Sequence, residues 1–232
     1  MNLAAQRRVS VIALAVTAVL LSACSPASNS AATPSASTAK PSKTASSTPS
    51  PSPTVEAASE ERLELTFGAA EELIQPGWGV HWTDPFVTDK NFAVLSPDDG
   101  AGSWSYTDVT TACELHFYQG EIFDLDWSQD DRATSDQMLA VLAMGTPTPE
   151  DSAEVSRMAG EYALQLEPEP GEVELRTIGG RFPDGRSVVH ATRMIGALGG
   201  GITISMVCPA GQDTSSEFER ISENHLRVLV TK

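Results

Sequence analysis

The sequence predicts an α+β domain in which helices cover a mainly antiparallel sheet, placed after a disordered tether. Strand-like segments come before and after a pair of helical segments, and a closing helical segment follows the last strands. A long stretch rich in Ser, Thr, Ala and Pro precedes all of them. The chain therefore divides into an export segment over 1–23, a tether over 24–59 and a globular α+β domain over 60–232.

The first 24 residues have the plan of a secretory signal peptide. Arg7 and Arg8 supply the charged start, an apolar run begins at Val9, and Leu21-Ser22-Ala23-Cys24 brings small residues to the cut site. The run is short for a transmembrane helix, which needs about 20 apolar residues. Simple secretion after cleavage is the other alternative. The residues beside Arg7 and Arg8 match a twin-arginine signal poorly, so general secretion is expected.

The segment Leu21-Ser22-Ala23-Cys24 resembles the lipobox of bacterial lipoproteins, of the kind found on actinobacterial surfaces. The resemblance implies that Cys24 takes a diacylglyceryl group, with acyl chains such as palmitate, and becomes the first residue of the mature chain. Two acyl chains, at ~0.8 kcal/mol per buried CH2, hold a protein firmly where one chain does not. The implied location is the extracytoplasmic face of the cell membrane, with the membrane itself as partner.

Residues 25–59 consist almost entirely of Ser, Thr, Ala and Pro. Such a segment has too few apolar side chains to offset the entropy lost on ordering, so we expect it to be disordered. Its prolines favour an extended polyproline II conformation. We interpret it as a tether that holds the domain away from the bilayer.

The charge balance argues against a nucleic-acid partner. Lys and Arg number 15 and Asp and Glu number 31, which gives a formal net charge of -16. Removing Arg7 and Arg8 with the signal peptide leaves 13 basic residues against 31 acidic ones, or -18. A surface of this sign repels nucleic acid and anionic lipid headgroups. The simplest interpretation is that the acidity keeps the domain soluble and off the membrane.

The cysteine count predicts one disulfide. The chain has three cysteines, and lipidation of Cys24 leaves Cys113 and Cys208 as an even pair in an oxidising compartment. The bridge would close a loop of 208 − 113 = 95 residues, which contributes about 4–5 kcal/mol in the chain-entropy model. Two buried free thiols are the alternative.

The first half of the domain contains a short helical segment and four β-prone segments. The helix is expected over Ala69–Ile74, and Pro97-Asp98-Asp99-Gly100 has strong turn chemistry. In the last β-prone segment Cys113, Leu115 and Phe117 alternate with polar residues, as in a half-buried strand. The four segments are Gly79–Thr83, Asn91–Leu95, Trp104–Asp108 and Thr111–Gln119.

Two helices are expected in the middle of the domain. Thr134-Ser135 is a plausible N-cap for the first, which Gly145 ends. Thr148-Pro149-Glu150-Asp151 is a better start signal for the second, since it combines a cap, a proline at the first helical position and early acids. The second helix is expected to continue along a single stripe of Val155, Met158, Ala159, Tyr162 and Leu166.

The last third is predicted to be a β-meander followed by a covering helix. The strands are expected over Val173–Ile178, Arg186–Ile195 and Ile202–Cys208, with Pro183-Asp184-Gly185 as a turn and Gly199-Gly200-Gly201 as a tight connection. A capping box over Ser216–Glu219 starts the helix, whose stripe comprises Phe218, Ile221, His225 and Leu229.

The element order over 78–232, with its ending of hairpin, Cys, Pro and helix, is similar to the PsbP-like fold used by some lipoproteins. The resemblance implies a domain without a catalytic site. The sequence also contains no G-x-S-x-G elbow and no H-E-x-x-H zinc motif. No catalytic residue, cofactor or metal ligand is therefore assigned. The four histidines, interpreted as structural, are His81, His116, His190 and His225.

Two further patterns have a functional and a structural interpretation. Asp124, Asp126, Ser128 and Asp130 alternate like calcium ligands, but Gln129 and Ser135 stand where a calcium loop needs Gly and Glu, so a solvated acidic loop is preferred. The tryptophans could stack on sugar rings, although core packing is the commoner use; they are Trp78, Trp82, Trp104 and Trp127.

The expected function is a non-catalytic, membrane-anchored binding or interaction module that contacts an envelope protein or glycan. The alternatives are a cell-envelope hydrolase whose site gathers scattered His and Asp, or a glycan-binding protein. A cleft with gathered titratable groups and shifted pKa values would favour the hydrolase.

Overall fold

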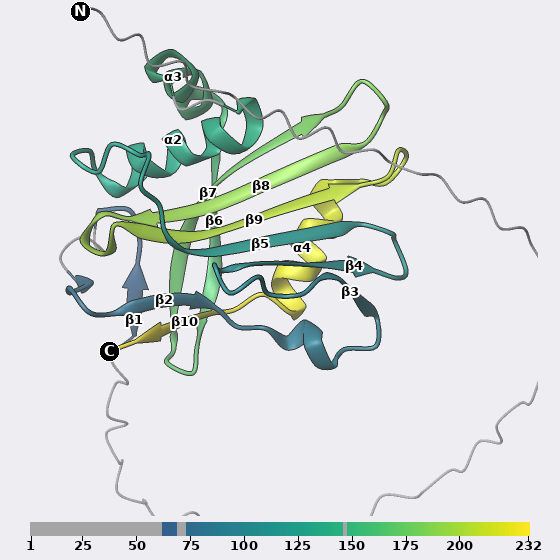
Figure 1. Cartoon of the computed structure of the whole chain (residues 1–232), viewed down its shortest axis with the longest axis horizontal. Helices are drawn as coiled ribbons and strands as arrows, with labels where there is room; N and C mark the ends of the chain where they lie inside the picture. Colours follow the sequence, from purple (N-terminus) through teal and green to yellow (C-terminus); the bar gives the residue numbers. More distant parts are fainter. Residues whose placement is uncertain (1–61, 69–72, 146–147) are drawn as a thin grey trace, which may run out of the picture. The chain divides into compact units, whose positions relative to one another are not determined.

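The computed structural model describes residues 62–68, 73–145 and 148–232 (Figure 1). These residues form a curled, mainly antiparallel sheet with helices packed on it, which confirms the predicted fold class. The strands are β1 (Leu63–Leu65), β2 (Gly79–Trp82), β3 (Phe92–Ser96), β4 (Ser103–Asp108), β5 (Glu114–Glu121), β6 (Gly160–Glu167), β7 (Gly171–Arg181), β8 (Ser187–Ile195), β9 (Gly200–Cys208) and β10 (Val228–Thr231). The α-helices are α2 (Asp131–Met144), α3 (Pro149–Met158) and α4 (Thr214–Asn224).

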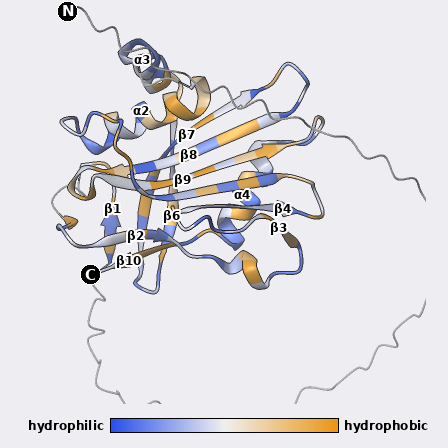
Figure 2. Ribbon diagram, in the orientation of Figure 1, coloured by the Kyte–Doolittle hydropathy of each residue, from blue (hydrophilic) through white to orange (hydrophobic). Residues whose placement is uncertain are grey.

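The ten strands pair in the order β2-β10-β6-β7-β8-β9-β5-β4-β3, and β1 joins the start of β7. All pairs are antiparallel except β10 with β6 and β1 with β7. Strands β5 and β9 alternate large apolar side chains with polar or smaller ones over much of their length, and the apolar and polar stretches of the sheet can be followed in Figure 2. In β9 this alternation places Ile202, Ile204, Met206 and Cys208 on one fully buried face.

The helices pack on opposite faces of the sheet. Phe218 and Ile221 of α4 belong to the main apolar core, together with Ala191 of β8. His190 directly precedes Ala191 on β8, so its side chain points to the opposite face. Ile178 of β7 is the cross-strand partner of His190 and therefore points to that same opposite face. There it packs against the smaller cluster that α2 and α3 form. The two faces are therefore covered by different helices with different cores.

Two predicted helical stripes are wrong because each runs on into a strand. Helix α3 ends at Met158, and Tyr162 and Leu166 belong to β6, which pairs with β7. Helix α4 ends at Asn224, and Leu229 belongs to β10. A spacing of four residues places two side chains on one face of either a helix or a strand, so this spacing could not distinguish them.

Two predicted helix starts also need correction, and one is confirmed. Asp130 caps α2 by accepting from the Ala133 amide at 2.7 Å, whereas Thr134 and Ser135 lie inside the helix. Asp213, not Ser216, caps α4. In both cases an aspartate precedes the predicted start, and its ionised carboxylate makes a stronger hydrogen bond to a backbone amide than a neutral hydroxyl does. Thr148 caps α3 as predicted.

Other predictions lie outside the described residues. They concern the signal peptide, Cys24, the tether and most of the expected helix over Ala69–Ile74. Within the described ranges, no helix has both the length and the apolar character that crossing a bilayer requires.

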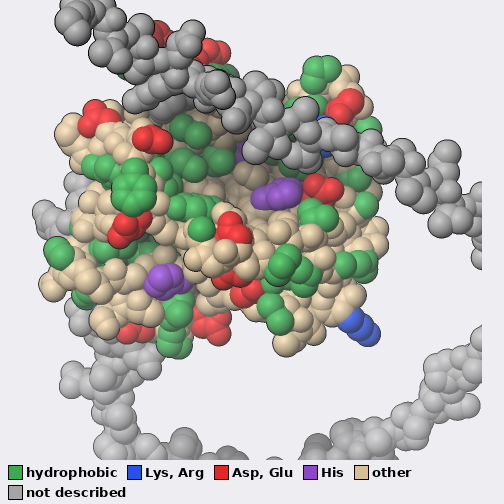
Figure 3. Space-filling model, viewed as in Figure 1, with side chains coloured by type: hydrophobic (Ala, Val, Ile, Leu, Met, Phe, Trp, Pro, Cys, Tyr) green, Lys and Arg blue, Asp and Glu red, His purple; other side chains and the backbone are tan. Residues whose placement is uncertain are grey.

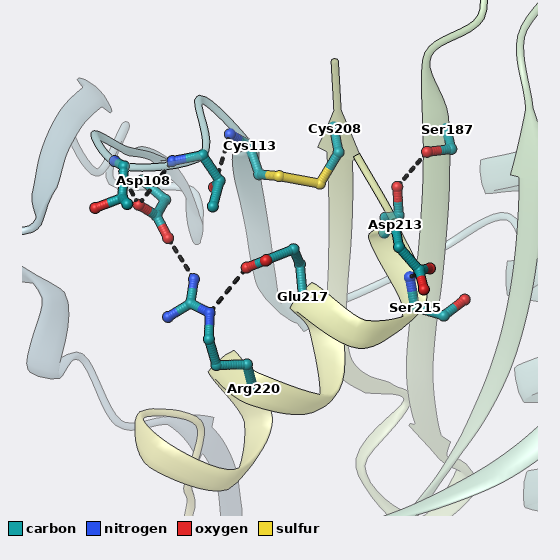
Figure 4. Close-up of a disulfide and its surroundings, with 11 residues drawn as sticks. Asp108, Cys113, Ser187, Cys208, Asp213, Ser215, Glu217 and Arg220 are labelled. Carbon is teal, nitrogen blue, oxygen red and sulfur yellow. Dashed lines mark hydrogen bonds and ion pairs between the residues drawn. A yellow bond between two sulfur atoms is a disulfide. The ribbon is translucent and has the colours of Figure 1, made fainter. Parts of the chain in front are cut away.

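The structure contains the disulfide between Cys113 and Cys208 (Figure 4). Cys113 directly precedes β5 and Cys208 ends β9, and their Cα atoms are 4.2 Å apart. Both residues are fully buried. The bridge therefore joins neighbouring strands under α4, with the Asp108–Arg220 ion pair beside it (Figure 4).

Candidate functional site

A cleft of about 590 Å³ lies where the beginning of β2, the end of β5 and the beginning of β9 approach the loop between β3 and β4. It brings together an indole ring, an imidazole, an amide and two carboxylates, from Trp78, His81, Gln119, Asp98 and Glu121. Ligand sites combine apolar contact surface with a few polar groups that fix orientation, and this cleft has both. In the described part of the chain its lining contains no Lys or Arg.

Glycines keep part of the cleft wall free of side chains. A Cβ atom on Gly102 would overlap the carbonyl oxygen of Gln119, and one on Gly200 would overlap that of Gly120. The backbones approach this closely because the strand ends are paired, as the hydrogen bond from the Gln119 amide to the Gly102 carbonyl shows at 3.0 Å. Gly102 also has φ +89°, a conformation that other residues rarely adopt.

Gln119 is held in place by the backbone of β2 at Trp82. Its Oε1 accepts from the backbone amide of Trp82 at 2.8 Å. The Trp82 indole nitrogen in turn donates to the Thr203 carbonyl at 3.0 Å. The amide that lines the cleft is thus fixed to β2, β5 and β9 before any ligand arrives, which lowers the entropy lost on binding.

The four tryptophans have different roles. Trp82 and Trp104 are core residues, as expected, with Trp104 stacked on Phe117 at a centroid distance of 5.4 Å. Trp127 is half-buried beside α2. Trp78 alone of the four lines the cleft, where it is half-buried and packs partly against the main core. Of the four tryptophans, Trp78 is therefore the one to which the sugar-stacking alternative can be put as a proposal.

Two of the histidines lie in one row across the sheet. His116 of β5 and His190 of β8 are both cross-strand partners of Ser205 in β9. His190 Nδ1 is 2.7 Å from the Ser205 hydroxyl oxygen. Burial lowers the pKa of His190 to about 4, so the imidazole is neutral near pH 7.

The contact between Ser205 and His190 forms only part of a hydrolase site. A nucleophile and base also need a carboxylate that orients the base and donors that stabilise an oxyanion. Among the described residues, no carboxylate lies within ion-pair distance of His190. Ser205 lies in the middle of β9, whose backbone is paired with strands on both sides. We interpret the pair as a structural hydrogen bond between β8 and β9.

In the acidic loop before α2, Asp126 and Asp130 accept hydrogen bonds from nearby residues of the same segment. Asp126 accepts from the Ser128 hydroxyl at 2.6 Å and from the Gln129 side chain at 3.0 Å, and these bonds lower its pKa. Asp130 is the N-cap of α2. Over residues 62–68, 73–145 and 148–232, no group of three or more His, Cys, Asp or Glu side chains is arranged to hold a metal ion.

The sequence alone presents Trp78 as one of four tryptophans and His81 as one of four histidines interpreted as structural, assigns neither to a site, and does not identify Gln119 or Glu121. They end a strand, Gln119-Gly120-Glu121, that meets the Gly199-Gly200-Gly201 segment across the β5–β9 pair. A glycine within a strand can mark close backbone approach. That signal was present, but only the strand order shows which glycine-bearing segments meet.

Comparisons with known proteins add little to this description. No protein-family model matches the chain, and no curated protein matches its sequence. Among solved structures, the crystal structure of LpqN, involved in cell envelope biogenesis of Mycobacterium tuberculosis, is similar at a TM-score of 0.29 and 14% identity, covering 66% of this chain and 92% of LpqN. A likeness at this level carries no conclusion about the role of the chain. The lipobox and PsbP-like resemblances remain predictions.

Proposed function

We propose that this protein is a lipid-anchored, non-catalytic binding module on the extracytoplasmic face of the cell membrane, and that it binds an envelope glycan in the Trp78 cleft. The observation that carries the binding role is the cleft itself, with an indole, two carboxylates and a fixed amide around about 590 Å³. Aromatic rings bind the C–H faces of sugars, while amides and carboxylates accept their hydroxyl hydrogens.

The anchored location rests on the sequence. Leu21-Ser22-Ala23-Cys24 supplies the acceptor thiol, and the disulfide between Cys113 and Cys208 fits an oxidising compartment. The Pro-rich segment that links Cys24 to the domain would act as an extended spacer, so that the cleft can contact glycans outside the bilayer.

Labelling with an alkyne fatty acid in intact cells tests the anchor. The wild type is expected to incorporate the label at Cys24, Cys24→Ser is expected to lose it and to leave the membrane fraction, and the neighbouring variant Ser25→Ala is expected to behave as wild type. Label retained on Cys24→Ser, or its retention in membranes at wild-type level after signal cleavage, would show that the anchor is elsewhere.

Titration of the purified protein with soluble cell-wall glycan fragments tests the cleft. Wild-type tryptophan fluorescence is expected to change on binding, and Trp78→Ala is expected to weaken binding at least about tenfold, because stacking contributes ~1 kcal/mol or more beyond area burial. Trp127→Phe is the matched control outside the cleft. Equal affinities for wild type and Trp78→Ala, with unchanged melting temperatures, would contradict the proposed site.

A further inference from the structure

We infer that the glycan bound in the Trp78 cleft carries a protonated amine, as an amino sugar does. This inference rests on the proposed function, because it names the chemistry of the ligand for the same cleft. It follows from the charge of the lining, from the behaviour of the Trp78 ring and from the field of the whole protein.

The charged groups of the cleft have one sign. Asp98 and Glu121 supply carboxylates. Asp98 is exposed, and its Oδ1 accepts a hydrogen bond from the Gly100 backbone amide at 2.8 Å. The backbone carbonyl of Glu121 accepts from the Tyr118 hydroxyl at 2.6 Å. Among the described residues, no hydrogen-bond or ion-pair partner contacts the Glu121 carboxylate. The Glu121 carboxylate is therefore available to a ligand.

The Trp78 ring already holds a cation. The Lys232 ammonium lies 5.4 Å from the ring centroid, and the same ammonium is 3.1 Å from Glu169. An indole attracts an ammonium through the negative face of its π-system, at about 0.5–1 kcal/mol in exposed positions. The contact shows that the ring accepts an ammonium, and a ligand amine would replace Lys232 there while Lys232 keeps its ion pair with Glu169.

The protein as a whole also attracts cations. Its formal net charge is -16, and acidic side chains are scattered over the face in Figure 3, where Lys and Arg are few. A field of this sign raises the local concentration of cationic ligands and lowers that of anionic ones. A uronic acid or a phosphorylated sugar would meet two carboxylates, and among the described residues the lining supplies no Lys or Arg to offset them.

Calorimetric titration with three matched tetrasaccharides tests the inference. They are the β-1,4-linked tetramers of glucosamine, N-acetylglucosamine and glucose. They are compared at about pH 6, because the neighbouring oxygens of the sugar make its amine less basic than an ordinary amine, while carboxylates are still ionised at this pH. The glucosamine tetramer is expected to bind most tightly. Glu121→Gln and Asp98→Asn are each expected to weaken it by about threefold to fivefold, as for partly exposed ion pairs, with less effect on the two neutral tetramers. Glu150→Gln, exposed on α3, is the control.

The outcomes separate this inference from the proposed function. Preference for the glucosamine tetramer that is lost in Glu121→Gln or Asp98→Asn supports the amine. Equal binding of all three tetramers, or preference for a neutral one, overturns the amine but leaves a glycan site, provided that Trp78→Ala abolishes the binding. Absence of binding by the wild type to all three tetramers overturns the inference and counts against glycan binding as well.

Discussion

The two helix-covered faces of the sheet are held in different ways. Beneath α4 lies the large apolar core, closed at one end by the Cys113–Cys208 disulfide. Beneath α2 and α3 the apolar cluster is small, and two buried ion pairs lie beside it: Arg176 with Asp136 at 2.6 Å, and Arg193 with Asp131 at 3.3 Å.

The buried arginines connect elements that apolar contacts join weakly. The Arg176 guanidinium reaches Asp136 of α2, the Ser156 carbonyl of α3 and Glu161 of β6. Arg193, fully buried, lies over the Phe67 ring at 3.9 Å. A buried ion pair adds little net stability to the protein, because both charges lose their hydration. It does favour a single arrangement of the two elements, because other arrangements would leave a buried charge without its partner. We therefore expect α4 to set stability through burial, and α2 to be positioned by polar specificity.

The largest effect is expected on the α4 face. Replacing Cys113 and Cys208 together by serine removes the constraint on a 95-residue loop, which costs about 4–5 kcal/mol in the chain-entropy model. Urea unfolding of the oxidised wild type and of the double variant measures this difference. A loss below about 1 kcal/mol would mean that the apolar core holds this face without the bridge.

Breaking one partner of a buried pair is expected to cost almost as much on the other face. Asp136→Ala leaves the Arg176 charge buried and should lower the free energy of unfolding by about 3–4 kcal/mol. Exposed Asp184, paired with Arg186 on the surface, provides the control, since Asp184→Ala should cost less than about 1 kcal/mol. Similar losses in the two variants would show that the buried pair is solvated.

An intermediate effect, dependent on pH, is expected at His190. Its folded pKa lies below the ordinary value, so the unfolded chain binds the proton first as pH falls from 7 to 5. Stability is therefore lost over this range, by at most about 2 kcal/mol. Urea unfolding at pH 7 and at pH 5 measures this loss. The free energy of unfolding of His190→Gln should fall less between the two pH values than that of His116→Gln, which keeps His190 and changes an exposed histidine. Parallel losses in these two variants would contradict burial as the cause.

The smallest net effect is expected when both partners of the buried pair are replaced. Asp136→Leu with Arg176→Met removes both charges and keeps most of the volume, so we expect a change within about 1 kcal/mol of wild type. In this double variant we expect faster hydrogen exchange of the α2 amides than in the wild type, because apolar packing alone restricts the position of the helix less than the ion pair does. Unchanged exchange together with unchanged stability would show that the ion pair does not position α2.

Much of the fold could be predicted from local pattern. Period-two alternation identified β5 and β9, and turn chemistry identified Pro97–Gly100 and Pro183–Gly185. The prediction failed at β6 and β10, where Tyr162 and Leu229 lie at spacings that suit a helix as well as a strand. Strand pairing decided these segments, since β6 and β10 gain partners in β7 and β2 that a helix would lack.

The site was less predictable than the fold. Trp78 and His81 stand out in the sequence as an aromatic and a titratable residue, but nothing local connects them with Gln119 and Glu121. These residues meet because β2 reaches the end of β5 only after the sheet has curled through β10 and β6.

The sequence by itself determined the acidic charge, the even pair of domain cysteines and the alternation within β5 and β9, because each depends on residues close in the chain or on composition alone. Only the tertiary structure decided which strands are neighbours, how the two helical faces differ and where the cleft forms. Those features arise from contacts between residues far apart in sequence, whose free energy exists only when the whole sheet is assembled.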